Sequence, residues 1–168
     1  MKKNRFVTRC ATFFLVVTSF SVAVFSCTEK DADKVKPETI TDIILKDTQF
    51  SILRDIVLYA QMSDALRTEN LTVFAPDNAA FGKANVFSSS VITSLPVDSA
   101  ISFINSHIIK SSLPYNELKV GNQPAVSRNN ISITKIDSTV YVNNSEIVIG
   151  DVNADNGIIH VIDSLLVR

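Results

Sequence analysis

Two short segments constrain the fold of this chain more than any other part. The first reads TVFAPDNAAF over Thr72–Phe81, and the second reads NGIIHVID over Asn156–Asp163. Each joins an apolar run to a sharp change of direction, because Pro76 ends a strand and Asn156-Gly157 favours positive φ and a turn. The segments therefore predict one compact core with a buried strand near each end, and neither holds a catalytic constellation.

The first 26 residues have the pattern of a secretory signal peptide. Four cations precede the apolar run Ala11–Phe25, which is too short to span a bilayer comfortably and ends at Ser26-Cys27. This ending resembles a bacterial lipoprotein box, which implies that Cys27 is acylated and becomes the mature N-terminus. Phe25 is bulkier than the usual residue at its position in the box. The alternatives are an uncleaved N-terminal anchor and ordinary secretion.

Cysteine usage and charge fit an anchored protein of the cell envelope. Only Cys10 and Cys27 occur, so a chain cut before Cys27 forms no internal disulfide and depends on its core for stability. Without residues 1–26, twelve Lys+Arg face seventeen Asp+Glu, a net charge of −5. That balance argues against a nucleic-acid partner and against adhesion to anionic lipid. We expect attachment to the outer membrane through the acyl chain, on its periplasmic or its surface-exposed face.

The mature chain divides into a tether over residues 27–37 and one domain over residues 38–168. Thr28–Pro37 is charged and closed by proline, as is typical of a linker, and its acidic residues also fit a surface-export signal. Apolar residues at helical spacing predict helices between residues 40 and 60 and over Val97–Ile108, with Ser63 capping a short helix between them.

The remaining pattern predicts strands. Leu71–Ala75 is a strand, and Asp77 is placed to cap the helix that follows. After Gly121 apolar residues alternate with polar ones, and Asn143-Asn144 predicts a tight turn into a strand over Glu146–Ile149. The last strand is expected over Ile158–Val167. Helices followed by a run of antiparallel strands predict an α+β fold.

The two opening segments also carry a resemblance. TVFAPDNAAF resembles the first signature of the fasciclin (FAS1) domain, NGIIHVIDSLL resembles the second, and Phe103–Leu118 resembles the conserved middle of that domain. The chain thus resembles a bacterial FAS1-domain lipoprotein, which implies a wedge-shaped antiparallel β-sandwich with helices packed along one side. The signature positions, expected to be mainly structural, are Thr72, Phe74, Pro76, Phe81, His107, Asn156, Gly157, His160 and Asp163.

The sequence departs from the family pattern at two places. Many members have Tyr-His in the middle helix where this chain has Ser106-His107, and animal matrix members have Asp-Ile where it has Asp151-Val152. The receptor adhesion linked to those pairs is therefore not carried over. His107 and His160 both alternate with or lie beside apolar residues, which indicates core positions. No nucleophile elbow, phosphate loop, cofactor motif or transition-metal set occurs, and Asp151 with Asp155 lacks the spacing of an EF-hand loop.

These observations predict a non-catalytic, lipid-anchored envelope protein that mediates adhesion or binds an extracellular protein or polysaccharide. The expected contact regions are Lys83–Ser90, the turn Ser111–Tyr115 and the loop Asp151–Asp155, with Tyr115, Asp151 and Val152 as candidate contact residues. The alternative is a carrier of a small hydrophobic ligand, a lipid or a pigment, bound between helices and sheet. A hydrolase is the third and weakest interpretation.

Overall fold

The computed structural model describes residues 37–166, which belong to a compact unit spanning Lys36–Arg168. The predicted signal peptide, Cys27 and the tether up to residue 36 lie outside the described residues. The helices are α1 (Ile40–Lys46), α2 (Ser51–Tyr59), α3 (Asn78–Lys83), α4 (Ser90–Thr93) and α5 (Val97–Asn105), with 3-10 turns at Thr48–Phe50, Ala65–Arg67 and Tyr115–Glu117. The strands are β1 (Leu71–Pro76), β2 (Ile108–Ile109), β3 (Gly121–Pro124), β4 (Asn130–Ile136), β5 (Thr139–Val142), β6 (Ser145–Ala154) and β7 (Gly157–Ile162).

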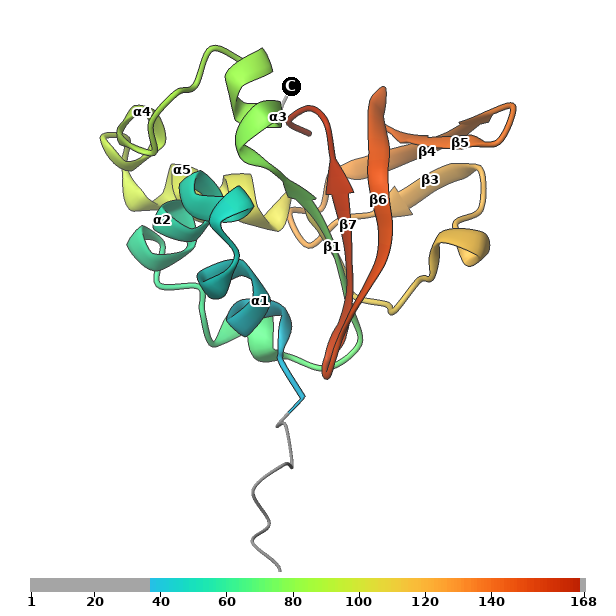
Figure 1. Cartoon of the computed structure of the whole chain (residues 1–168), viewed down its shortest axis with the longest axis horizontal. Coiled ribbons are helices and arrows are strands. Elements are labelled where there is room, and N and C mark those ends of the chain that lie inside the picture. The colour runs from blue at the N-terminus through green and yellow to red at the C-terminus, as the bar shows by residue number, and fades with distance from the viewer. Residues whose placement is uncertain (1–36, 167–168) are drawn as a thin grey trace, which may run out of the picture. The chain divides into compact units, whose positions relative to one another are not determined.

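The strands form one sheet in the order β2-β1-β7-β6-β5-β4-β3. Strand β6 joins its two halves: its first residues pair with β5, and it then continues along β7 with two register shifts. Such bulges bend and twist a strand, so one long strand serves both halves of the expected sandwich. In Figure 1 the helices gather on one side of β1 and β7, while β3, β4 and β5 lie on the other side.

Two apolar cores follow from this arrangement. The first lies between the helices and one face of β1 and β7, and its largest fully buried side chains include Phe50, Ile56 and Phe81. The second lies between the two halves of the sheet and includes Phe74, Ile131, Val142 and Ile162. Strand β1 is buried along its whole length because it faces both cores. This layering confirms the predicted α+β class with helices on one side.

Local sequence explains several element boundaries. Asp77 caps α3 by accepting a hydrogen bond from the Ala80 amide at 2.7 Å, as predicted. Asn143 and Asn144 have φ of 48° and 71°, which gives the tight β5–β6 turn that their sequence favours. At the start of α1, Thr39 and Asp42 form a capping box.

Other boundaries differ from the sequence-based expectation. Strand β1 pairs with β7 in parallel, so the sheet is not wholly antiparallel. Ser63 caps no helix; its carbonyl accepts a hydrogen bond from the Thr41 hydroxyl. Helix α5 ends at Asn105 because Ser106 turns back to bond the Phe103 carbonyl, and β2 follows at once. Strand β6 extends to Ala154, so the expected loop Asp151–Asp155 is mostly strand, and β7 ends at Ile162 rather than Val167.

Candidate functional site

Asn156 joins three distant parts of the chain inside the protein. Its side-chain oxygen accepts from the Ile40 amide at 2.9 Å, and its amide nitrogen donates to the carbonyls of Leu66 and Thr68, both at 2.8 Å. The Ile40 amide is one of the unpaired donors at the start of α1, so Asn156 completes that helix end. The residue is 2% exposed. The expectation of positive φ at Asn156-Gly157 is wrong, since neither residue has it.

Gly157 is required by a close approach of two strands. A Cβ atom on this residue would lie 2.1 Å from the carbonyl oxygen of Leu71, which pairs with it across β1 and β7. The second signature thus needs Asn for hydrogen bonding and Gly for space. Both residues act in the fold through their contacts and not through positive φ.

Thr72, His160 and Asp151 hold the segment before the 3-10 turn at Tyr115. The Thr72 hydroxyl donates to the Ser111 carbonyl at 2.6 Å and accepts from the Leu113 amide at 2.9 Å. The imidazole of His160 bridges the same segment to β6, with Nε2 at 2.9 Å from the Leu113 carbonyl and Nδ1 accepting from the Asp151 amide at 3.2 Å. This pattern assigns a neutral ring with its proton on Nε2. The turn Ser111–Tyr115 is therefore bonded to β1 through Thr72 and to β7 through His160.

His107 lies beside a serine, yet the pair cannot act as a nucleophilic dyad. Its Nδ1 is 2.7 Å from the Phe103 carbonyl, and Nε2 accepts from the Leu166 amide at 3.1 Å. The ring therefore carries its proton on Nδ1, the nitrogen that lies 3.0 Å from the Ser106 hydroxyl. A general base needs a free lone pair facing the hydroxyl, and this nitrogen has none. His107 instead fixes the chain at Leu166 against the end of α5.

Both histidines make stability depend on pH. Burial, opposed by the hydrogen bond to the Phe103 carbonyl, lowers the pKa of His107 to about 4, and burial also lowers the pKa of His160. Below pH 6.5 the unfolded chain binds protons that the folded chain excludes, so this contribution is full above pH 6.5 and is lost toward pH 4. When the pH falls from 6.5 to 5.5, we expect protonation of His107 in the unfolded chain to lower the free energy of unfolding by about 1 kcal/mol. Urea unfolding across this range measures it; a constant free energy would contradict the neutral assignment.

The remaining signature residues are also engaged in the fold. Asp163 accepts hydrogen bonds from Lys83 Nζ at 2.6 Å, the Glu146 amide at 2.8 Å and the Ser145 hydroxyl at 3.1 Å. Burial opposes ionisation there, but these donors prevail and the pKa of Asp163 stays below its usual value. Phe74 stacks on His160 with ring centroids 5.7 Å apart, Phe81 packs against Phe103, and Pro76 ends β1.

Tyr115, expected as a contact residue, is built into the fold on several sides. Its amide donates to the Asp151 carboxylate at 2.7 Å, and its hydroxyl accepts from the Val140 amide at 3.1 Å. Its ring packs so closely on Gly150 that a Cβ there would lie 2.9 Å from Cδ2. Asp151 itself has φ of 58°, a conformation that aspartate tolerates better than most residues.

Replacing Tyr115 with phenylalanine is expected to lower the free energy of unfolding by about 1 kcal/mol, because the Val140 amide loses its acceptor. Chemical denaturation of the purified chain measures the change. The control is Asn116→Ala. Asn116 follows Tyr115 in the chain and is exposed, so this change should have little effect on the free energy of unfolding. An unchanged stability of the Tyr115→Phe chain would contradict a stabilising role for this hydrogen bond.

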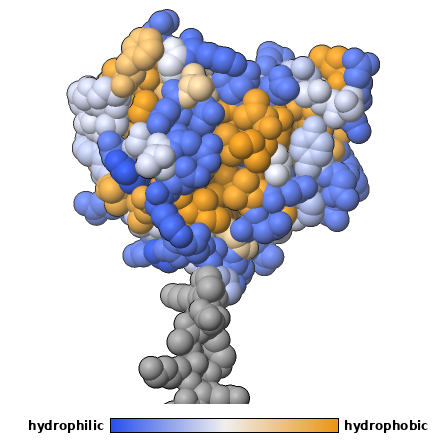
Figure 2. Space-filling view, in the orientation of Figure 1, coloured by the Kyte–Doolittle hydropathy of each residue, from blue (hydrophilic) through white to orange (hydrophobic). Residues whose placement is uncertain are grey.

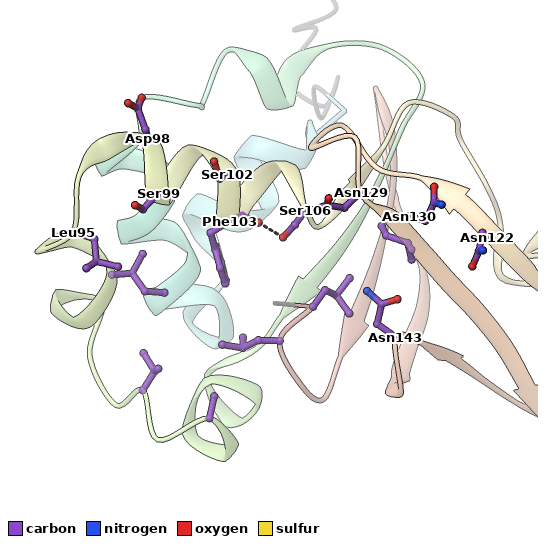
Figure 3. Close-up of a pocket in the computed structure, with 16 residues that line it drawn as sticks. Leu95, Asp98, Ser99, Ser102, Phe103, Ser106, Asn122, Asn129, Asn130 and Asn143 are labelled. Atoms are coloured by element: carbon purple, nitrogen blue, oxygen red, sulfur yellow. Dashed lines mark hydrogen bonds between the residues drawn. The ribbon is translucent and has the colours of Figure 1, made fainter. Parts of the chain in front are cut away.

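A pocket of about 1180 Å³ opens between α5 and the β3–β4 hairpin. Figure 3 shows Ser99 and Ser102 of α5, with Ser106 just after its end, along one side and asparagines of the hairpin and the β5–β6 turn along the other. The hairpin is fixed to α5, since the Ser127 amide donates to the Asn105 carbonyl at 3.1 Å. The sixteen lining residues are Ala84, Val86, Ile92, Leu95, Asp98, Ser99, Ser102, Phe103, Ser106, Asn122, Asn129, Asn130, Ile131, Asn143, Leu165 and Leu166.

The expected contact regions do not include most of this pocket. A sequence signal existed in the serines at 99, 102 and 106, whose spacing places them on one face of a helix. The asparagines come from separate strands, and only the pairing of β3 with β4 brings Asn122 near Asn130. Of the expected regions, Lys83–Ser90 contributes Ala84 and Val86 to the lining. Phe87, which follows Val86 in the chain, is 78% exposed.

An apolar surface occupies the centre of another face. Figure 2 shows hydrophobic residues gathered over the region where β6 and β7 lie in Figure 1. Val148 and Ile149 of β6 are 48% and 47% exposed. Ile149 pairs with Val161 of β7, and the side chains of this pair point to the same face of the sheet. The helices cover that face only in part. This surface and the pocket are the two features of the described residues with the character of contact sites.

The described residues contain no group of three or more histidine, cysteine, aspartate or glutamate side chains placed to hold a metal ion. Within the same part of the chain, no helix combines the length and the apolar character needed to cross a bilayer.

Comparison with known proteins identifies the family. The family model of the Fasciclin domain matches residues 48–168. The chain belongs to the fasciclin (FAS1) domain family, as its two signatures predicted.

Relatives of similar length occur in Synechocystis. Protein sll1483 is 27% identical over 92% of this chain and 89% of its own length, and protein sll1735 is 30% identical over 76% of this chain and 96% of its own. Immunogenic protein MPB70 of Mycobacterium bovis is 31% identical, with 61% of this chain aligned to 52% of that protein.

The fold matches a solved FAS1 domain pair. The structure from the insect cell adhesion molecule fasciclin I superposes with a TM-score of 0.63 at 18% identity, over 78% of this chain and 51% of that one. This likeness confirms the predicted FAS1 fold. The match covers about half of that two-domain structure.

Proposed function

We propose that this protein is a lipid-anchored FAS1 module of the cell envelope that binds an extracellular protein or polysaccharide and performs no chemistry of its own. The observation that carries the proposal is the order of parts: an apolar leader, Cys27 in a lipoprotein-like box, a charged linker and one FAS1 domain. The acyl chain would fix the position of the domain, with about 0.8 kcal/mol gained per buried methylene.

The contacts of the domain support binding rather than catalysis. Both histidines are neutral, buried and bonded to backbone groups, so they are unavailable as general bases. The solved FAS1 domain pair described above belongs to an adhesion molecule, and we extend that role to this chain as a proposal. A carrier of a hydrophobic ligand is less favoured, because eight of the sixteen pocket-lining residues are polar whereas such sites are lined mostly by apolar side chains.

The anchor is tested by replacing Cys27 with serine. We expect the protein to move from the membrane fraction to the soluble fraction, because the serine hydroxyl does not receive the acyl chains. Fractionation of cells that make each chain, followed by immunoblotting, measures the distribution. The matched control is Cys10→Ser, which lies in the predicted leader and should leave the distribution unchanged. Membrane retention of the Cys27→Ser chain would contradict the anchor.

Binding is tested separately with the full chain in detergent. The chain is applied to arrays of oligosaccharides and of purified envelope proteins, and we expect saturable binding to at least one of them. A chain that is folded by circular dichroism and binds nothing on either array would overturn the adhesion proposal.

A further inference from the structure

We infer that the pocket between α5 and the β3–β4 hairpin is the ligand site of this protein and takes an uncharged oligosaccharide. The inference rests on the proposed adhesion function and adds to it the site and the class of ligand. It depends on three properties of the pocket: the kind of polar groups on its rim, its charge, and its apolar floor.

The rim offers groups that both donate and accept hydrogen bonds. No side-chain hydrogen bond ties Asn122, Asn129 or Asn130 to another described residue, and the serines on the facing helix add hydroxyl groups. Asparagine supplies two donors and one acceptor with two lone pairs, and serine supplies one donor and two lone pairs. Sugar hydroxyls need both kinds of partner at once. Both sides of the pocket therefore offer partners for sugar hydroxyls.

The charge of the pocket excludes acidic ligands. Asp98 is the one charged residue among the sixteen that line it, and no lysine or arginine is present there. A uronic acid, sulfate or phosphate would meet no cationic partner and would be repelled by Asp98. Residues 27–168 contain more acidic than basic side chains, and their net negative charge also repels anionic ligands at long range.

The apolar residues of the lining, called its floor here, suit the apolar faces of sugar rings. They include Val86, Ile131 and Leu166, and a single aromatic ring, Phe103, which is 8% exposed. The volume of about 1180 Å³ lies above the range of about 300–1,000 Å³ that is typical for small ligands, which favours an oligosaccharide over a single sugar. Grooves for Pro-rich peptides are lined by aromatic residues and those for phosphorylated or acidic peptides by arginine clusters, and this lining has neither.

The pocket is held in shape by groups that the proposal does not disturb. The Val126 amide donates to the Ile108 carbonyl at 2.9 Å, and His107 holds Leu166 at the floor. The rim residues Ser102, Asn122 and Asn130 are exposed, and their side chains make no hydrogen bond to another described residue. Substitutions there change the site and leave the fold intact.

The test measures binding of neutral hexasaccharides of glucose, mannose, xylose and N-acetylglucosamine to the full chain in detergent, beside oligogalacturonate as an acidic probe. We expect a neutral series to bind and oligogalacturonate not to bind. The double variant Asn122→Ala/Asn130→Ala should weaken that binding about tenfold through two lost hydrogen bonds. Ser102→Phe should weaken it further, because the larger side chain obstructs the α5 side of the pocket. The matched control Asn153→Ala, on exposed β6, should bind like the original chain, and thermal unfolding verifies that every variant is folded.

Several results would overturn the inference. These are binding of oligogalacturonate alone, neutral binding that neither pocket variant weakens, and a peptide ligand that depends on the same residues. Absence of sugar binding also overturns it. If the chain then still binds an envelope protein, the adhesion function stands without this site; if it binds neither sugar nor protein, both proposals fall.

Discussion

Alanine in place of Gly157 is expected to lower the free energy of unfolding by about 3 kcal/mol. The new methyl group would lie 2.1 Å from the Leu71 carbonyl oxygen and 2.9 Å from the Leu71 nitrogen. These atoms belong to the backbone of β1, so no side chain can rotate away to make room. Relief requires β1 and β7 to separate where they pair in parallel. Urea unfolding followed by circular dichroism measures the loss.

A second glycine provides the control. A Cβ on Gly82 would lie 3.7 Å from the Phe87 ring, an ordinary contact, and the residue is in α3. Alanine there is expected to raise the unfolding free energy by about 0.5 kcal/mol, because glycine is unfavourable inside a helix. Equal effects at the two positions would contradict the account of Gly157.

Alanine in place of Asn156 is expected to cost about 4 kcal/mol, because three backbone groups lose their partners together. The Ile40 amide and the Leu66 carbonyl are buried, so water does not replace the lost amide freely. Aspartate at this position keeps the acceptor for Ile40 but loses both donors. It tests whether the loss arises mainly from the two carbonyls of Leu66 and Thr68.

The control for this prediction is Asn153→Ala, three residues earlier on the exposed side of β6. Its effect should lie within about 0.5 kcal/mol of zero. Unfolding midpoints of the three variants, measured under one set of conditions, give the comparison. If Asn156→Ala were as stable as Asn153→Ala, the hydrogen bonds of Asn156 would not stabilise the fold as described.

Local patterns in the sequence predicted the local parts of the structure. Asp77 caps α3, Asn143-Asn144 turns into β6, and the alternating Ile131 and Ile133 are buried, because each depends on neighbouring residues alone. The FAS1 resemblance supplied the layered arrangement of sheet and helices, but it gave no strand order and implied antiparallel pairing throughout. The parallel pairing of β1 with β7 joins residues far apart in sequence, and periodicity carries no information about strand direction.

The role of Asn156 shows why the site was harder to predict than the fold. Asparagine before glycine is a turn signal, yet this asparagine bonds residues 88 to 116 positions away. In the same way, the pocket assembles asparagines of a hairpin and serines of a helix that only tertiary structure brings together. Conversely, Tyr115 and Asp151, which the sequence predicts as contact residues in loops, are bonded to each other in the structure.

Attachment of whole cells tests the central claim most directly, since it combines the anchor with binding. Cells that make the original chain are compared with cells that make the Cys27→Ser chain, on a surface coated with the oligosaccharide or envelope protein found by the arrays. We predict that the original cells are retained, that the Cys27→Ser cells are not, and that released Cys27→Ser protein blocks retention of the original cells. Equal retention of both kinds of cell, with no block by the released protein, would contradict a lipid-anchored adhesion module.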